Sequence, residues 1–158
     1  KEVPPQIPFL HLVLAAQMVG SDVRRAVEVL GRSGYVVGDT GWLSRRLHHA
    51  RNWLTGYAPD VFKFKVREEL PAEVVELSGE QKKLLAILAE RFRDCEWRAE
   101  GIHNLIHEHG KRLGLSPARS FQAIYLALLG KKSGPRAGWF ITSLDRAFVV
   151  QRFLEASV

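Results

Sequence analysis

The residues that could carry chemistry are few, and His103 and His107 are the most suggestive among them. They stand four residues apart with His109 close by, so two imidazoles would share one face of a helix. A zinc site needs further ligands, and the metalloprotease pattern has glutamate directly after its first histidine, where this chain has Asn104. We therefore expect no metal site, and we interpret these histidines as surface or capping residues.

Other catalytic patterns are incomplete in the same way. Gly130-Lys-Lys-Ser133 resembles the end of a phosphate-binding loop, but the glycine required five positions earlier is replaced by Tyr125. The single cysteine, Cys95, has carboxylates on both sides, which disfavour a reactive thiolate. No serine stands in a Gly-x-Ser-x-Gly elbow. We expect no catalytic residue and no cofactor, so this chain alone is predicted to lack catalytic activity.

The basic residues are more informative, because they are segregated from acidic ones. The net charge is +6, which favours a polyanionic partner without establishing one. No acidic residue lies between Glu108 and Asp145, and this stretch contains Lys111, Arg112, Arg119, Lys131, Lys132 and Arg136. A second acid-free stretch, from Thr40 to Pro59, contains Arg45, Arg46, His48, His49 and Arg51. Such segregation suits a phosphate backbone, although either run could also be a solvated helix face.

Aromatic residues join the basic residues after Gly130. Trp139 and Phe140 directly follow a turn rich in glycine, lysine and arginine. Unstacked RNA bases are held by stacking on aromatic side chains and by hydrogen bonds to their edges, so this segment suits a single-stranded RNA loop. We expect Phe140 to be a core residue, whereas Trp139 could either stack on a base or belong to the core.

Helical periodicity dominates the elements that must position these residues. Apolar residues recur at spacings of three and four, and capping residues or glycines mark the ends. Before residue 70 we expect three helices: Ile7–Gly20, one from Val23 to Gly31 or Gly34, and one from the 38–41 turn to about Thr55. Beyond residue 75 we expect helices that start at Ser78 (a capping box with Gln81), Trp97, Ser116-Pro117, about Gly138 and near Asp145.

The predicted fold class is therefore all-α, a helical bundle of seven or eight helices. Val61–Arg67 alternates apolar and basic residues, but a lone strand has no partner, so we interpret it as an extended connector. The break from Pro71 to Ser78 suggests two lobes, residues 1–75 and 76–158. The longest apolar run, Ile7–Val19, is too short and too polar to span a membrane. A single cysteine favours a reducing, cytoplasmic location.

Four segments of the chain resemble one protein family, in the same order. The most specific is Tyr125–Phe140, which includes Leu-Gly-Lys-Lys-Ser-Gly-Pro-Arg and resembles the C-terminal signature of class I lysyl-tRNA synthetases. Pro4–Phe9, Asn52–Pro59 and Glu100–His103 also fit that family. Because the sequence begins at Lys1 rather than methionine, we expect it to be a piece of a longer protein.

The resemblance implies a function for the chain. Members of the family join lysine to its tRNA with ATP on an N-terminal Rossmann-type catalytic domain, whose HIGH-like and KMSKS-like motifs are absent here. Their C-terminal part is a cage of helices that holds the anticodon. The implied partners are the anticodon loop of tRNA(Lys) and the protein's own catalytic domain. The residues expected to bind RNA are Lys131, Lys132, Arg136, Trp139, Arg45, Arg46, Arg51 and Arg119.

Two alternatives stay open at this point. Glutamyl-tRNA synthetases carry a segment similar to the Gly-Pro-Arg turn, so the chain could be a glutamyl-type anticodon-binding module. A basic helical module that binds a protein is the alternative from another class. It differs in predicting binding that salt does not weaken.

Overall fold

The fold of the chain is all-α, as the sequence predicts. A computed structural model describes residues 6–158, and within that range it contains eight α-helices, two short 3-10 helices and no strand. Lys1, Pro4 and Pro5, which enter the sequence argument above, lie outside the described residues. None of the described helices is long and apolar enough to cross a membrane.

The chain divides into two compact units, Lys1–Lys65 and Val66–Val158, which we call the first and second unit. The division lies ahead of the predicted boundary between residues 75 and 76. Arg152 explains why the second unit begins so early. Its buried guanidinium donates hydrogen bonds to the carbonyl oxygens of Arg67 (2.9 Å) and Glu68 (2.8 Å), and thereby holds this segment in the second unit.

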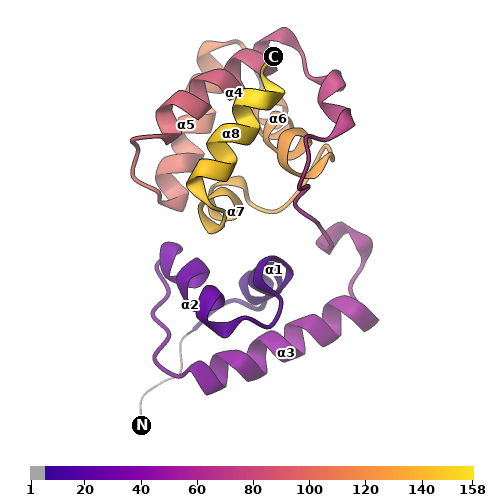
Figure 1. Cartoon of the computed structure of the whole chain (residues 1–158), viewed down its shortest axis with the longest axis vertical. Coiled ribbons are helices and arrows are strands. Elements are labelled where there is room, and N and C mark those ends of the chain that lie inside the picture. The colour runs from indigo at the N-terminus through magenta and orange to yellow at the C-terminus, as the bar shows by residue number, and fades with distance from the viewer. Residues whose placement is uncertain (1–5) are drawn as a thin grey trace. The chain divides into compact units, whose positions relative to one another are not determined.

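The first unit is built from three helices and a short 3-10 helix. They are α1 (Phe9–Val19), α2 (Val23–Arg32), α3 (Thr40–Gly56) and η1 (Asp60–Phe62) (Figure 1). The carboxylates of Asp22 and Asp39 cap α2 and α3 by accepting from backbone N–H groups in their first turns. Helix α2 ends at Arg32, between its two predicted ends, Gly31 and Gly34.

The core of the first unit lies between α1, α2 and α3. Its fully buried side chains include Leu12, Leu30, Leu43 and Leu47. The segment after η1 is extended, as predicted for the connector, although Val61 and Phe62 belong to η1 itself. Gln17 of α1 holds the connector in place, because its amide donates to the carbonyl of Phe62 and accepts from the N–H of Phe64, both at 2.9 Å.

The second unit contains the remaining helices. They are η2 (Ala72–Glu76), α4 (Gly79–Phe92), α5 (Ala99–Arg112), α6 (Pro117–Leu129), α7 (Ala137–Ser143) and α8 (Arg146–Ala156) (Figure 1). The predicted capping box is confirmed: the Ser78 hydroxyl accepts from the N–H of Gln81, and the Gln81 side chain accepts from the N–H of Ser78. Ser116 and Asp145 likewise cap α6 and α8.

Helix α6 lies at the centre of the second unit. Every residue from Ala123 to Leu129 is buried, and α6 contacts α4, α5, α8 and η2. The largest fully buried side chains around it include Phe92, Phe140 and Phe153. Because α6 is fixed on several sides, the segment that leaves its C-terminal end starts from a defined position.

Candidate nucleic-acid interface

The segment from Gly130 to Arg136, which we call the basic turn, joins α6 to α7 and is held on both sides. Gly130 has a φ of +66°, and a side chain there would lie 2.9 Å from a carboxylate oxygen of Glu73. A side chain at Gly134 would lie 2.7 Å from the Tyr125 ring. Gly130 favours glycine because of its left-handed backbone, and Gly134 because its backbone comes too close to the Tyr125 ring for a larger residue.

A tyrosine on α6 fixes the second half of the basic turn. The hydroxyl of Tyr125 donates a hydrogen bond to the carbonyl oxygen of Pro135 at 2.5 Å. Burial raises the pKa of the Tyr125 hydroxyl, which keeps it protonated and able to donate. The basic turn is therefore a preorganised loop rather than a free one.

The cationic side chains of the basic turn lie at the surface. Lys131, Lys132 and Arg136 are all exposed. The ammonium of Lys132 is 2.7 Å from a carboxylate oxygen of Glu76 on η2, and the two side chains are 65% and 46% exposed. An ion pair this exposed contributes only about 0–1 kcal/mol, so a phosphate can replace the carboxylate at small cost.

Trp139 does not lie where a base could stack on it. All of α7 is buried, and Trp139 itself is only 6% exposed. Trp139 is therefore a core residue, and we assign it no role in stacking on a base. Phe140 is fully buried, as predicted. The tight packing of α7 is the reason, since a short helix with so many apolar residues stabilises the unit only when buried.

Arg119 is exposed but lies away from the basic turn. It stands in the first turn of α6, where its carbonyl oxygen accepts from the Gln81 side chain at 2.8 Å. With a rise of 1.5 Å per residue, Arg119 and Lys131 are separated by about 18 Å along the helix direction. Arg119 therefore does not cluster with Lys131 at the start of the basic turn.

The three arginines of the first unit are exposed on α3, but they do not share a face. Successive residues of a helix are about 100° apart, which places Arg46 about 100° and Arg51 about 120° from Arg45, on opposite sides of it. The guanidinium of Arg46 lies over the Trp42 ring, 5.7 Å from its centroid. Arg45 points away from the buried stripe that includes Leu43. One RNA strand could not follow all three on a single surface of α3.

Sequence reasoning missed a pair of aromatic residues on the second unit. The rings of His103 on α5 and Phe121 on α6 are stacked, with centroids 5.0 Å apart and an angle of 24° between planes. His103 is exposed and Phe121 is half-buried. Periodicity places each residue on its own helix but does not show that the two helices bring them together. Among the described residues there is no cluster of histidine, cysteine or carboxylate side chains able to hold a metal ion.

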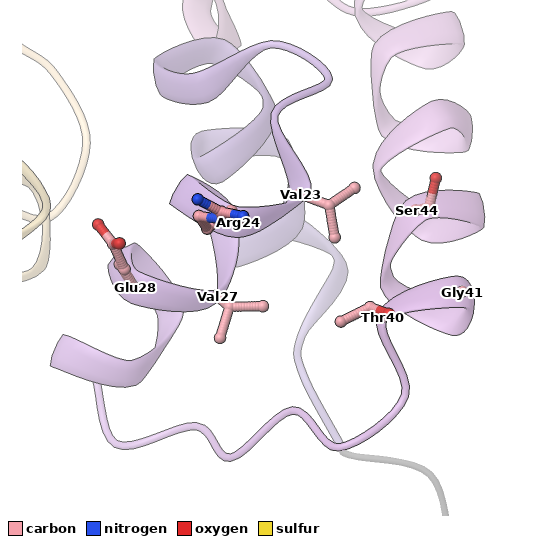
Figure 2. Close-up of a pocket in the computed structure, with 7 residues that line it drawn as sticks. All are labelled: Val23, Arg24, Val27, Glu28, Thr40, Gly41 and Ser44. Carbon is pink, nitrogen blue, oxygen red and sulfur yellow. The ribbon is translucent and has the colours of Figure 1, made fainter.

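A pocket in the first unit offers no catalytic chemistry. It has a volume of about 610 Å³ between α2 and the start of α3 (Figure 2). The lining residues are Val23, Arg24, Val27 and Glu28 from α2, and Thr40, Gly41 and Ser44 from α3. Its single carboxylate and its hydroxyls are not accompanied by a histidine or a second carboxylate that could act as a base.

The surroundings of Cys95 disfavour a reactive thiolate, as the flanking carboxylates predict. Cys95 is half-buried. Burial is the main cause that raises its pKa, and the nearby Arg146 opposes this only in part. A thiol with a raised pKa is a poor nucleophile at neutral pH.

Comparison with known proteins gives a family match to the connector and most of the second unit, and similar ligases over nearly the whole chain. The anticodon binding domain family matches residues 59–157. The lysine–tRNA ligase of Archaeoglobus fulgidus is 42% identical over 152 residues, covering 95% of this chain and 30% of the relative. Those of Methanosarcina barkeri and Methanopyrus kandleri are 34% and 33% identical, covering 96% and 99% of this chain and 32% and 31% of the relatives. The chain spans about a third of the length of these relatives.

Proposed function

Because the chain belongs to the anticodon binding domain family, we propose that it recognises the anticodon loop of a tRNA, and that this tRNA is the one charged with lysine. The observation that carries the proposal is the basic turn. Its backbone is fixed against α6 and η2, and its cationic side chains Lys131, Lys132 and Arg136 are exposed. A preorganised cationic loop binds a polyanion without first losing much conformational entropy.

In the proposed complex the basic turn contacts the single-stranded part of the anticodon loop. Lys131 and Lys132 hold phosphates as point charges, and Arg136 holds a phosphate or a base edge with its planar guanidinium. Lys132 exchanges the carboxylate of Glu76 for a phosphate. Arg45, at the centre of the exposed face of α3, contacts the backbone elsewhere on the RNA. The positive charges of Arg46, Arg51 and Arg119 help to attract the RNA.

The rest of the proposed activity belongs to a larger protein. We propose that this protein is a lysine–tRNA ligase, like the relatives from Archaeoglobus fulgidus and Methanosarcina barkeri, and that it acts in the cytoplasm. Its ATP-dependent step would be carried out by an N-terminal catalytic domain in the part of the relatives that this chain does not span. The chain's own residues would position the tRNA rather than activate lysine.

Binding of an anticodon stem-loop under a salt series tests this function. We expect Lys131→Ala/Lys132→Ala to weaken binding by about tenfold at physiological salt. The slope of log K against log salt should fall in magnitude by about 1.4, since each lost phosphate contact on a single strand removes about 0.7. Fluorescence anisotropy with a labelled hairpin measures both quantities.

The matched control removes the same charge from the same unit. Lys83→Ala/Lys111→Ala deletes two exposed lysines. Lys83 lies in the first half of α4, whose first turn contacts the start of α6, and Lys111 follows Gly110, which also packs at the start of α6. We expect a much smaller change in slope for this control. Equal losses in both double variants would mean that only net charge matters, and would refute the assignment to the basic turn.

A further inference from the structure

The stacked pair of His103 and Phe121 has an open side. One face of the imidazole is covered by the Phe121 ring at a centroid distance of 5.0 Å. His103 is nevertheless exposed, so its solvent-accessible surface is on the other face and along the ring edge. A planar group could extend the stack on that outer face.

The stacked pair lies at the far end of the path that the basic turn follows. Phe121, Tyr125 and Leu129 are spaced by four residues and share one face of α6. The turn runs back along this face, because Gly134 approaches Leu129 and Tyr125, and Pro135 accepts from the Tyr125 hydroxyl. The chain therefore proceeds from Lys131 toward Phe121.

The start of α7 then reaches His103 itself. A β-carbon at Gly138 would lie 3.2 Å from the β-carbon of His103 and 2.2 Å from the carbonyl oxygen of Ala99. Gly138 follows Arg136 by only two residues. The guanidinium of Arg136 and the imidazole of His103 thus come from segments in direct backbone contact.

The helices that carry the two rings are packed closely. At Gly110 of α5, a β-carbon would lie 2.0 Å from the Ser120 hydroxyl oxygen of α6. This close approach places α5 against the residue next to Phe121. The backbones that carry the two rings are therefore fixed relative to each other, so a ligand that stacks on the rings needs to order only side chains.

The nearest charge on α5 itself disfavours a phosphate as the ligand of the His103 ring. Glu100 precedes His103 by three residues and His107 follows it by four, so both are its neighbours on the same side of α5. The exposed carboxylate of Glu100 repels a phosphate placed on the ring. A base carries no charge, and aromatic faces stack on bases of every type.

We propose that His103 and Phe121 form a stacking platform for one unpaired base of the bound RNA, next to phosphates held by the basic turn. This proposal rests on the proposed RNA-binding function and adds a base contact that the charge pattern does not supply. The platform contacts only the face of the base, so it contributes affinity without distinguishing one base from another.

The test uses the full chain and anticodon hairpins that carry the fluorescent base 2-aminopurine at successive loop positions. Binding to wild-type protein should change the fluorescence most at one position, where the base leaves its neighbours for the imidazole. His103→Ala should weaken binding by about tenfold, within a range of about five- to 140-fold for one base stack. It should abolish the fluorescence change at that position and leave the salt slope unaltered.

Two further variants separate stacking from charge and from misfolding. His103→Phe keeps an aromatic face and should retain both affinity and the fluorescence change. His107→Ala removes the neighbouring imidazole and should bind as wild type does. Far-UV circular dichroism and thermal melts confirm that each variant is folded.

The outcomes separate this inference from the proposed function. If wild-type protein binds the hairpin with the expected salt slope but His103→Ala binds equally well, the platform is refuted and the function stands. If His103→Ala lowers the salt slope and His103→Phe does the same, the imidazole acts as a charge and the platform is again refuted. If wild-type protein binds no hairpin at low salt, both proposals fail.

Discussion

Replacement of Gly138 by alanine tests the close packing of α7 on α5, on which the geometry of the candidate interface depends. The added β-carbon would lie 2.2 Å from the carbonyl oxygen of Ala99, where ordinary contact begins at 3.4 Å. The neighbour is backbone, so no side chain can rotate away. The two helices must separate by about 1 Å or strain their backbones, which for an overpacked core costs about 1–3 kcal/mol.

Urea unfolding followed by circular dichroism measures this cost. The midpoint should fall while the slope of free energy against urea stays unchanged, because the surface exposed on unfolding is nearly the same. The matched control is Gly101→Ala on α5, where the nearest atom to an added β-carbon is 4.0 Å away. This exposed helical position should gain up to about 1 kcal/mol from the higher helix propensity of alanine.

The comparison of the two variants is decisive because the chemical change is identical. If Gly138→Ala is as stable as Gly101→Ala, α7 does not approach α5 as closely as the structure places it. The proximity of Arg136 to His103 would then lose its basis.

Three further predictions concern charged and titratable groups of the second unit. Glu76→Gln should tighten hairpin binding by up to about fivefold in anisotropy titrations and should not weaken it, because Lys132 no longer leaves an ion pair worth about 0–1 kcal/mol; weaker binding would contradict the exchange of Glu76 for a phosphate. Arg152→Met leaves three backbone carbonyls without their donor and should lower the free energy of unfolding by about 3 kcal/mol, whereas a loss below about 0.5 kcal/mol would contradict the role given to this side chain. Burial, followed by the charge of Arg112, lowers the pKa of His109. As the pH falls below about 6.5, the unfolded chain therefore binds the proton first and the folded state loses stability; in acid urea titrations His109→Gln should lose less stability than wild type, and an equal loss would exclude His109 as the cause.

The helices could be predicted because their ends depend on local chemistry. Ser78 with Gln81, Ser116 with its following proline, and Asp145 each cap a helix through contacts with their own first turn. Such signals need no knowledge of the rest of the fold. The fold class follows from the same periodicity, because the sequence contains no second strand for the connector to pair with.

The boundary between the units could not be predicted in the same way. Pro71 and Ser78 mark breaks in local structure, but residues 66–70 belong to the second unit through tertiary contacts. The side chain of Arg152, on the last helix, supplies these contacts. A sequence pattern does not reveal which distant side chain will bind a segment's carbonyl groups.

The candidate interface shows the same limit. The cationic character of the basic turn could be predicted, because composition alone determines it. The direction of the Trp139 ring depends on how α7 packs, and the stacking of His103 on Phe121 depends on how α5 meets α6. The different faces of Arg45 and Arg46 follow from helical geometry alone, whereas charge composition does not distinguish them.

The most direct test of the central proposal is the binding of this chain to a lysine tRNA anticodon hairpin, compared with the same hairpin in which the anticodon uridines are replaced. A filter-binding or anisotropy titration at physiological salt is sufficient. We predict clearly tighter binding to the intact anticodon, and a salt dependence for both hairpins. Equal affinity for both hairpins would contradict anticodon recognition, and no binding of either at low salt would contradict RNA binding altogether.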